Sequence, residues 1–349
     1  MKIETRSFGY TKNEEEVLEM ILSNDSGISV HILTFGAAIR KLIVPDRNKN
    51  PVNVVLGYED IRDYEKNPPY LGVVVGRYAG RINGAEFTID NTRYEVEKNN
   101  DGSCLHGGFK GLSRANWKVS SENVADDTVS IVLEYHSPDG EDHFPGNVDF
   151  ITEYSLNNKN ELSIEYTAVT DMPTLINMTN HSYFNFNNDP SEDIKNHYLT
   201  LDADTFIEGD QSTLGISETP VYGTPFDFRK TLQLGEGIDS GFPQIDIYGG
   251  YDHVFRINGH DINKAFARLY CESSGIEMNV HTTCQAVVLY TSNMMDDALT
   301  LCDNVKTKKH LGVCLETQYF PNDINCDFIK TQTILRPGEK YNEKTIYRF

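Results

Sequence analysis

Apolar and polar residues alternate along much of this chain, which is the pattern of β-strands with one buried face. Several short runs rich in β-branched residues and bounded by turn residues fit this pattern: residues 17–22, 28–33, 39–44, 129–135 and 162–168. The 3.6-residue apolar period of a long helix is absent, and only a short helical turn is expected, at residues 60–66. The pattern therefore predicts an all-β fold.

The turn residues indicate how the strands are connected. Asn83-Gly84 is typical of a hairpin turn, and Asp90-Asn91 predicts a second hairpin. Glycine and proline are spread evenly along the chain, with no linker, repeat or low-complexity segment. We therefore expect one large antiparallel domain of stacked sheets over residues 1–349.

Residues 176–186 carry more hydrogen-bonding groups than a half-buried strand normally has. A period of two places a row of polar side chains on one face: Asn177, Thr179, His181, Tyr183 and Asn185. Such a variety of amides, hydroxyls and an imidazole suits the binding of a polyhydroxylated ligand around one titratable group. A solvated strand face with an incidental histidine explains the segment equally well.

A second titratable group, Glu316, lies in the apolar and aromatic segment 311–325. Little charge lies nearby to solvate or neutralise it, so its carboxylate is expected in a pocket rather than on an open surface. Taken alone, a glutamate on the polar face of an edge strand is the simpler interpretation.

Three further segments place polar side chains beside glycines. Arg77 and Arg81 precede the Asn83-Gly84 turn, His106 precedes a glycine pair, and Asp252 follows one. Glycine lets the backbone approach a ligand closely, which favours binding at these positions. Surface arginines, a loop histidine and a turn-capping aspartate are the alternatives.

The 349-residue chain is strongly acidic, with 31 lysines and arginines against 52 acidic residues and a formal charge of -21. This balance disfavours nucleic acid or an anionic membrane as a partner.

The six cysteines form no Cys-x-x-Cys pair and no zinc spacing, so we expect no metal. The sequence shows neither a signal peptide nor a membrane span. We therefore expect the six cysteines to be reduced thiols in a cytoplasmic protein.

Five motifs occur in an order that is informative as a set. They are Gly-Arg-x-Ala-x-Arg-Ile at 76–82, Leu-His-Gly-Gly at 105–108, Thr-Asn-His-Ser-Tyr-Phe-Asn at 179–185, Gly-Tyr-Asp-His at 250–253 and Leu-Glu-Thr-Gln-Tyr-Phe-Pro-x-x-x-Asn at 315–325. The chain closely resembles the galactose mutarotases, or aldose 1-epimerases, from about residue 35 to the C-terminus. The resemblance implies a large β-sandwich that interconverts the α and β anomers of a free aldohexose such as galactose or glucose.

The same resemblance implies roles for individual residues. Glu316 corresponds to the general base and His181 to the general acid. Arg81, His106 and Asp252 correspond to groups that position the sugar. Ser182 and Tyr183 fall within the sugar-binding motif around the histidine. No metal, nucleotide or other cofactor is implied, and the chain is expected to act as a monomer or homodimer.

General acid–base catalysis of this kind implies a bell-shaped pH dependence. We expect the acidic limb to belong to Glu316 and the basic limb to His181. An optimum near neutrality requires the bound environment to raise the imidazole pKa, through the nearby carboxylates. Two positions depart from the family pattern. Gly80 stands where many members have asparagine, and Val288 stands where some have a ligand-contacting glutamine. These departures affect the expected sugar preference rather than the expected chemistry.

Three other functions fit single features. A glycoside hydrolase would use two carboxylates, Glu316 and Asp252, which leaves His181 without a role. A hexose-6-phosphate 1-epimerase needs additional arginine or lysine groups for the phosphate. A non-catalytic sugar-binding protein on the same scaffold needs neither the acid nor the base.

Overall fold

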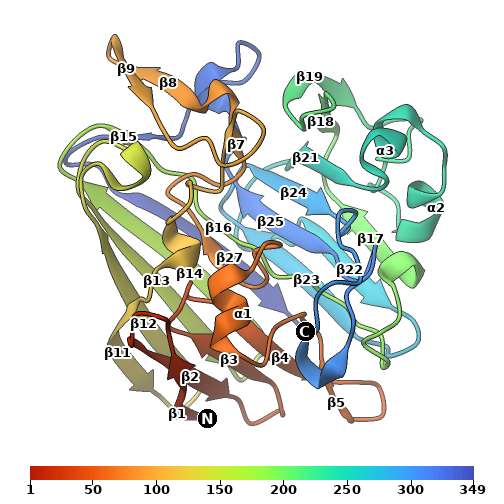
Figure 1. The fold of residues 1–349 in the computed structure, drawn as a ribbon. Helices are drawn as coiled ribbons and strands as arrows, with labels where there is room; N and C mark the ends of the chain where they lie inside the picture. Colours follow the sequence, from red (N-terminus) through yellow and green to blue (C-terminus); the bar gives the residue numbers. More distant parts are fainter.

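A computed structural model describes all residues 1–349 as antiparallel sheets packed in layers (Figure 1). The largest sheet has nine strands in the order β11 (Lys118–Val124), β12 (Thr128–Ser137), β13 (Val148–Asn157), β14 (Glu161–Thr170), β27 (Tyr341–Arg348), β23 (Glu277–Thr282), β22 (Ala267–Cys271), β17 (His197–Leu201) and β20 (Leu232–Gln233).

Two five-stranded sheets contribute the other main layers. The first follows the chain order: β1 (Lys2–Tyr10), β2 (Glu16–Ser23), β3 (Ser29–Leu33), β4 (Ile39–Pro45) and β5 (Pro51–Asn53). The second has the order β19 (Gly215–Pro220), β18 (Thr205–Gly209), β21 (Asp252–Arg256), β24 (Ala286–Tyr290) and β25 (Cys314–Gln318).

Short elements connect these sheets. Four two-stranded pairs are β6 (Val74–Val75) with β16 (Thr179–Asn180), β7 (Arg81–Ile82) with β10 (Cys104–Leu105), β8 (Glu86–Ile89) with β9 (Thr92–Glu95), and β15 (Thr174–Leu175) with β26 (Ile334–Leu335). The α-helices are short: α1 (Ile61–Lys66), α2 (Leu234–Ile238) and α3 (Pro243–Tyr248). None of the helices has the length and apolar character that a membrane crossing requires.

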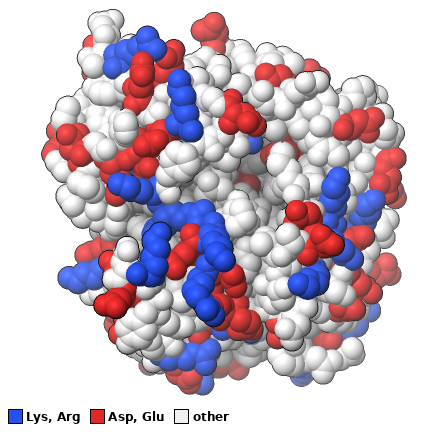
Figure 2. All heavy atoms as spheres, viewed as in Figure 1, with Lys and Arg blue, Asp and Glu red and all other residues white.

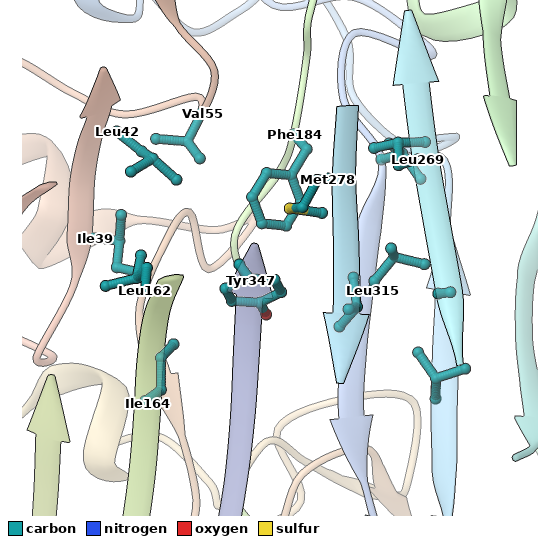
Figure 3. Packing of buried hydrophobic residues seen from close by; sticks show 14 of the residues in the cluster. Ile39, Leu42, Val55, Leu162, Ile164, Phe184, Leu269, Met278, Leu315 and Tyr347 are labelled. Carbon is teal, nitrogen blue, oxygen red and sulfur yellow. The ribbon is translucent and has the colours of Figure 1, made fainter. Parts of the chain in front are cut away.

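A cluster of 58 buried apolar residues fills the space between the layers. Figure 3 shows Ile39 and Leu42 of β4 on one side of this core and Leu315 of β25 on the other, with Phe184 and Tyr347 between them. Strand β14 alternates buried and half-buried residues over most of its length, as a strand with one face on a core must. Because both five-stranded sheets share this core with the nine-stranded sheet, we infer a single domain over residues 1–349.

The strand pattern of the sequence predicted this architecture correctly. The expected strands correspond to β2, β3, β4, β12 and β14, and the helical turn corresponds to α1. Asp90-Asn91 closes the β8–β9 hairpin as expected. The prediction for Asn83-Gly84 was wrong, because β7 pairs with β10 while β8 pairs with β9. This turn therefore joins two different sheets, and local sequence does not record which partner a strand finds.

We expect Phe184→Ala to destabilise the fold strongly. Its ring is 1% exposed, and its centroid lies 5.3 Å from that of Tyr347. Truncating a buried aromatic ring leaves a cavity and costs about 3–5 kcal/mol. Urea unfolding would measure the loss, with Tyr222→Ala as the control because Tyr222 is 82% exposed. Equal midpoints for the two variants would contradict the central position of Phe184 in the core.

Candidate active site

A pocket of about 420 Å³ lies over strands β21, β24 and β25, and this side of the molecule is hollowed near its centre in Figure 2. Strand register determines which side chains form the pocket floor. Val254 pairs with Val288, and Val288 pairs with Glu316. Because paired residues lie on the same face of a sheet, these three side chains form one row across the floor. Leu315, the neighbour of Glu316, points the other way into the core.

His181 approaches Glu316 from a segment without regular strand structure. This segment follows β16, and the His181 backbone N–H donates to the Val73 carbonyl at 2.9 Å. The imidazole Nε2 lies 3.4 Å from Glu316 Oε1, and both side chains are almost completely buried. The ring of Tyr183 stacks on the imidazole with centroids 5.0 Å apart. Two titratable groups that lie far apart in the sequence are therefore paired inside the pocket.

Burial shifts the pKa values of the two groups in opposite directions. It raises the pKa of Glu316 well above its usual value, and the nearby carboxylate of Asp252 adds to this shift. Burial also lowers the pKa of His181 to about 4. Desolvation therefore dominates the imidazole pKa in this structure, and the expected rise in the sugar-bound site stays a prediction. Between these two pKa values the pair holds one proton, which the two residues share as a coupled system.

Asp252 and Arg81 supply further charge at the pocket. Burial raises the pKa of Asp252 to about 6, and the positive charge of Arg81 opposes this shift. The Nε–H of Arg81 donates to Asn100 Oδ1 at 3.0 Å, which orients the guanidinium. Arg81 is the only lysine or arginine that lines the pocket.

His106 is held beside Gly80 by the backbone. The Gly80 N–H donates to His106 Nδ1 at 3.2 Å, so the neutral His106 ring carries its proton on Nε2. Burial lowers the pKa of His106 well below its usual value, and the neighbouring His181 and Arg81 act in the same direction. His106 is thus a neutral donor in the pocket wall. Gly80 has φ +76°, and a Cβ there would lie 2.6 Å from Pro321, which explains why glycine stands at this position.

Most polar side chains of residues 176–186 form hydrogen bonds within the protein and do not face the pocket. The Asn177 amide donates to the carbonyls of Ala79 and Tyr319, and the Asn185 amide donates to those of Glu192 and Leu311. A buried segment with little regular strand pairing leaves neighbouring backbone groups to be satisfied in this way. The density of amides in this segment therefore reflects its burial.

The two remaining predicted residues, Ser182 and Tyr183, lie differently relative to the pocket. Ser182 is buried at 2% exposure and is not part of the pocket lining. Tyr183 lines the pocket with its ring, but its hydroxyl donates to the Pro69 carbonyl at 2.8 Å. Tyr183 supports the imidazole of His181, and its hydroxyl is already used by the protein.

Several pocket residues were missed in the sequence. The ring of Tyr70 meets that of His106 edge-on, with centroids 4.7 Å apart. The pocket lining also includes several apolar side chains: Ile207, Val254, Val288, Phe320 and Ile329. No local pattern distinguishes these residues from ordinary core positions. Only the unexpectedly apolar Val288 gave a signal.

One group of side chains has the composition of a metal site. Donor atoms of His181, Cys314 and Glu316 lie within 4.8 Å of one another. The imidazole turns Nδ1 toward Cys314 and Nε2 toward Glu316, so no single nitrogen serves both neighbours. We assign no metal to this group, and the expectation that the reaction needs none stays a prediction.

The fold and the pocket together define an all-β protein with a buried carboxylate–imidazole pair suited to acid–base chemistry on a small polar ligand. A family model described as aldose 1-epimerase matches residues 19–348. Galactose mutarotase of Sus scrofa is 35% identical over 349 residues, which cover 99% of this chain and 98% of the relative. Aldose 1-epimerase of Escherichia coli K12 is 30% identical over 335 residues, or 95% of this chain and 94% of the relative.

Solved structures agree with these sequence matches. The crystal structure of galactose 1-epimerase from Lactobacillus acidophilus NCFM has a TM-score of 0.86 at 28% identity, covering 99% of this chain and 98% of that one. The chain belongs to the aldose 1-epimerase family, and it is an isomerase of that type.

We expect Arg81→Ala to impair turnover without unfolding the protein. The half-buried side chain bonds to Asn100 but joins no salt bridge. Loss of the only cation at the pocket should lower kcat/KM by about 100-fold, while the melting temperature stays within a few degrees. Polarimetry and thermal unfolding would measure the two effects, with Arg93→Ala on the exposed β8–β9 hairpin as the control. An unfolded or fully active Arg81→Ala variant would rule out this role.

Proposed function

We propose that this chain interconverts the α and β anomers of free aldohexoses such as galactose and glucose, with Glu316 as general base and His181 as general acid. The observation that carries the proposal is the contact of 3.4 Å between His181 Nε2 and Glu316 Oε1 inside the pocket. Relatives named galactose mutarotase and aldose 1-epimerase support the choice of substrate and reaction.

Ring opening moves one proton at each end of the hemiacetal. Glu316 removes the proton of the C1 hydroxyl, and the electrons of that O–H bond form the C1 carbonyl. The bond from C1 to the ring oxygen breaks, and the ring oxygen receives the Nε2 proton of His181. After rotation about the C1–C2 bond, the two residues exchange roles and the ring closes on the other face of the aldehyde. Each group contributes about 10²–10⁴-fold acceleration.

The shared proton of the pair is suited to this exchange. Ionised Glu316 with protonated His181 contains the same number of protons as neutral Glu316 with neutral His181. The reactive form is therefore a tautomer of the resting pair and requires no proton from solvent. A sugar hydroxyl at Glu316 and a ring oxygen at His181 stabilise the charged tautomer by hydrogen bonding to it.

Three neighbouring groups would hold the sugar. Arg81 donates hydrogen bonds and stabilises negative charge that develops on the ring oxygen. The Nε2–H of His106 donates to a sugar oxygen. Asp252 accepts hydrogen bonds from sugar hydroxyls when it is ionised. Val254 and Val288 on the pocket floor offer an apolar surface for the C–H face of the ring.

The pocket charge disfavours a phosphorylated substrate. A phosphate is normally bound by several donors with positive charge, whereas Arg81 stands alone among acidic groups here.

We also propose a cytoplasmic location, supported by six free cysteines of which five are buried. Monomer or homodimer remains the prediction for the oligomeric state.

Glu316→Gln should lower the rate of anomerisation by about 10²–10⁴-fold, because the amide keeps the shape of the side chain but cannot accept the proton. Polarimetry of freshly dissolved α-D-galactose and α-D-glucose would measure the rate, and calorimetry should find sugar affinity nearly unchanged. Glu153→Gln on β13 is the matched control, since Glu153 lies outside the pocket. Wild-type protein that left the relaxation at the buffer rate would overturn the proposed function.

The pH dependence of kcat/KM tests the shared proton, because this parameter reports the free enzyme. The high pKa of Glu316 and the low pKa of His181 assign the basic limb to Glu316, which reverses the order expected from the sequence. Asp252→Asn removes a negative neighbour that raises the Glu316 pKa, so the basic limb should move to lower pH. Asp246→Asn on α3 serves as the control. A basic limb that stayed in place or moved to higher pH would refute the assignment.

A further inference from the structure

Aromatic neighbours determine the plane of the His181 ring but not the position of its nitrogens. The rings of Tyr183 and Tyr70 are both inclined by 26° to the imidazole, with centroids 5.0 Å and 6.2 Å away. His106 contacts the same ring edge-on at 5.4 Å. Stacking is nearly unchanged when the imidazole flips by 180° about its Cβ–Cγ bond. Such a rotation would place carbon atoms where the two nitrogens now lie, so another interaction must select the orientation.

Cys314 supplies the polar contact on the inner side of the ring. Its Sγ lies 3.6 Å from His181 Nδ1, within the distance of a hydrogen bond to sulfur. Cys314 precedes Glu316 by two positions on β25, so both side chains point to the same face. The imidazole therefore spans two side chains of one strand, with Nδ1 at the thiol and Nε2 at the carboxylate. Cys314 itself is fully buried and lies outside the pocket lining.

We propose that Cys314 is a positioning residue whose sulfur accepts the Nδ1–H of His181 and so keeps Nε2 as the nitrogen that exchanges a proton with substrate. This inference rests on the proposed function, in which His181 acts as the acid. Cys314 touches neither the sugar nor the reacting atoms and acts only through the imidazole.

The proton count of the reaction requires a hydrogen-bond acceptor for the Nδ1–H of His181. The imidazolium carries a proton on each nitrogen, and only the Nε2 proton passes to the ring oxygen. The neutral imidazole that remains must keep its Nδ1–H, because Nε2 has to take a proton back at ring closure. A buried N–H without a partner is unfavourable, and a sulfur lone pair satisfies it weakly. The Nδ1–H then stays on the ring through opening and closure.

A thiol is suited to this position because it stays uncharged. Burial raises the pKa of Cys314 well above its usual value, and the carboxylates of Glu316 and Asp252 act in the same direction. A carboxylate in its place would accept the same Nδ1–H but would also stabilise the imidazolium and hold its proton more tightly. An uncharged acceptor orients His181 and leaves the proton easy to release.

The other groups around His181 have different partners. The Tyr183 hydroxyl donates to the Pro69 carbonyl, and the Tyr290 hydroxyl accepts from the Met294 backbone N–H. The Nδ1 of His106 accepts from the Gly80 N–H. Glu316 faces Nε2 rather than Nδ1. Cys314 is thus the side chain that faces Nδ1.

Replacement of the thiol separates positioning from packing. Cys314→Ala should lower kcat for galactose by about 5- to 10-fold, the effect of one hydrogen bond of about 1 kcal/mol, with KM changed less than two-fold. Cys314→Ser should restore most of kcat, because a hydroxyl oxygen also accepts an N–H. Cys284→Ala is the matched control, since Cys284 is another buried free cysteine away from the pocket. Wild-type kcat in Cys314→Ala would overturn the proposal.

Nitrogen-15 NMR of the wild-type histidine rings provides a test that no variant's folding can obscure. The neutral His181 ring should carry its proton on Nδ1, and Cys314→Ala should shift the tautomer toward Nε2–H. A wild-type ring protonated on Nε2 would overturn the role of Cys314 even if the protein is an active mutarotase. If the wild-type protein left anomerisation at the buffer rate while His181 carried its proton on Nδ1, the proposed function would be refuted. The contact between Cys314 and His181 would still stand.

Discussion

The site depends on one contact, that between the imidazole of His181 and the carboxylate of Glu316. Water would keep the two groups near their ordinary pKa values, and at neutral pH the carboxylate would hold no proton. Burial disfavours both charges, so it raises the carboxyl pKa and lowers the imidazole pKa. Between the two shifted pKa values the pair holds a single proton, which can lie on either partner. Acid–base exchange at this site follows from desolvation as much as from the identity of the two residues.

The sheets and the irregular segment 176–187 cooperate to hold this contact. Strand β25 lies beside β24 with Leu315 in the core, and this anchors Glu316 from below. His181 lacks such a strand and is held by hydrogen bonds of the surrounding backbone. The asparagine amides at 177 and 185 donate to carbonyls of neighbouring segments. A regular strand and an irregular segment held by hydrogen bonds thus meet at the pocket.

Local sequence was sufficient for the elements but not for all their partners. Period-two patterns located β2, β3, β4, β12 and β14, because alternation is a direct consequence of one buried face. Asn83-Gly84 was misinterpreted, since the partner of β7 is β10, which lies beyond a further hairpin. Pairing between distant strands is a property of the whole chain. Ordered motifs were enough to indicate the family and its chemistry.

The sequence by itself determined the fold class, the family and the identity of the titratable groups, because strand periodicity and ordered motifs are local properties. Tertiary structure alone decided which of these groups meet. It brought Arg81, His106, His181, Asp252 and Glu316 together at one pocket, left Ser182 outside its lining, and used the Tyr183 hydroxyl elsewhere. It also reversed the order of the two pKa values and placed Cys314 against His181. The reason is that desolvation and side-chain contacts depend on packing between residues far apart in sequence.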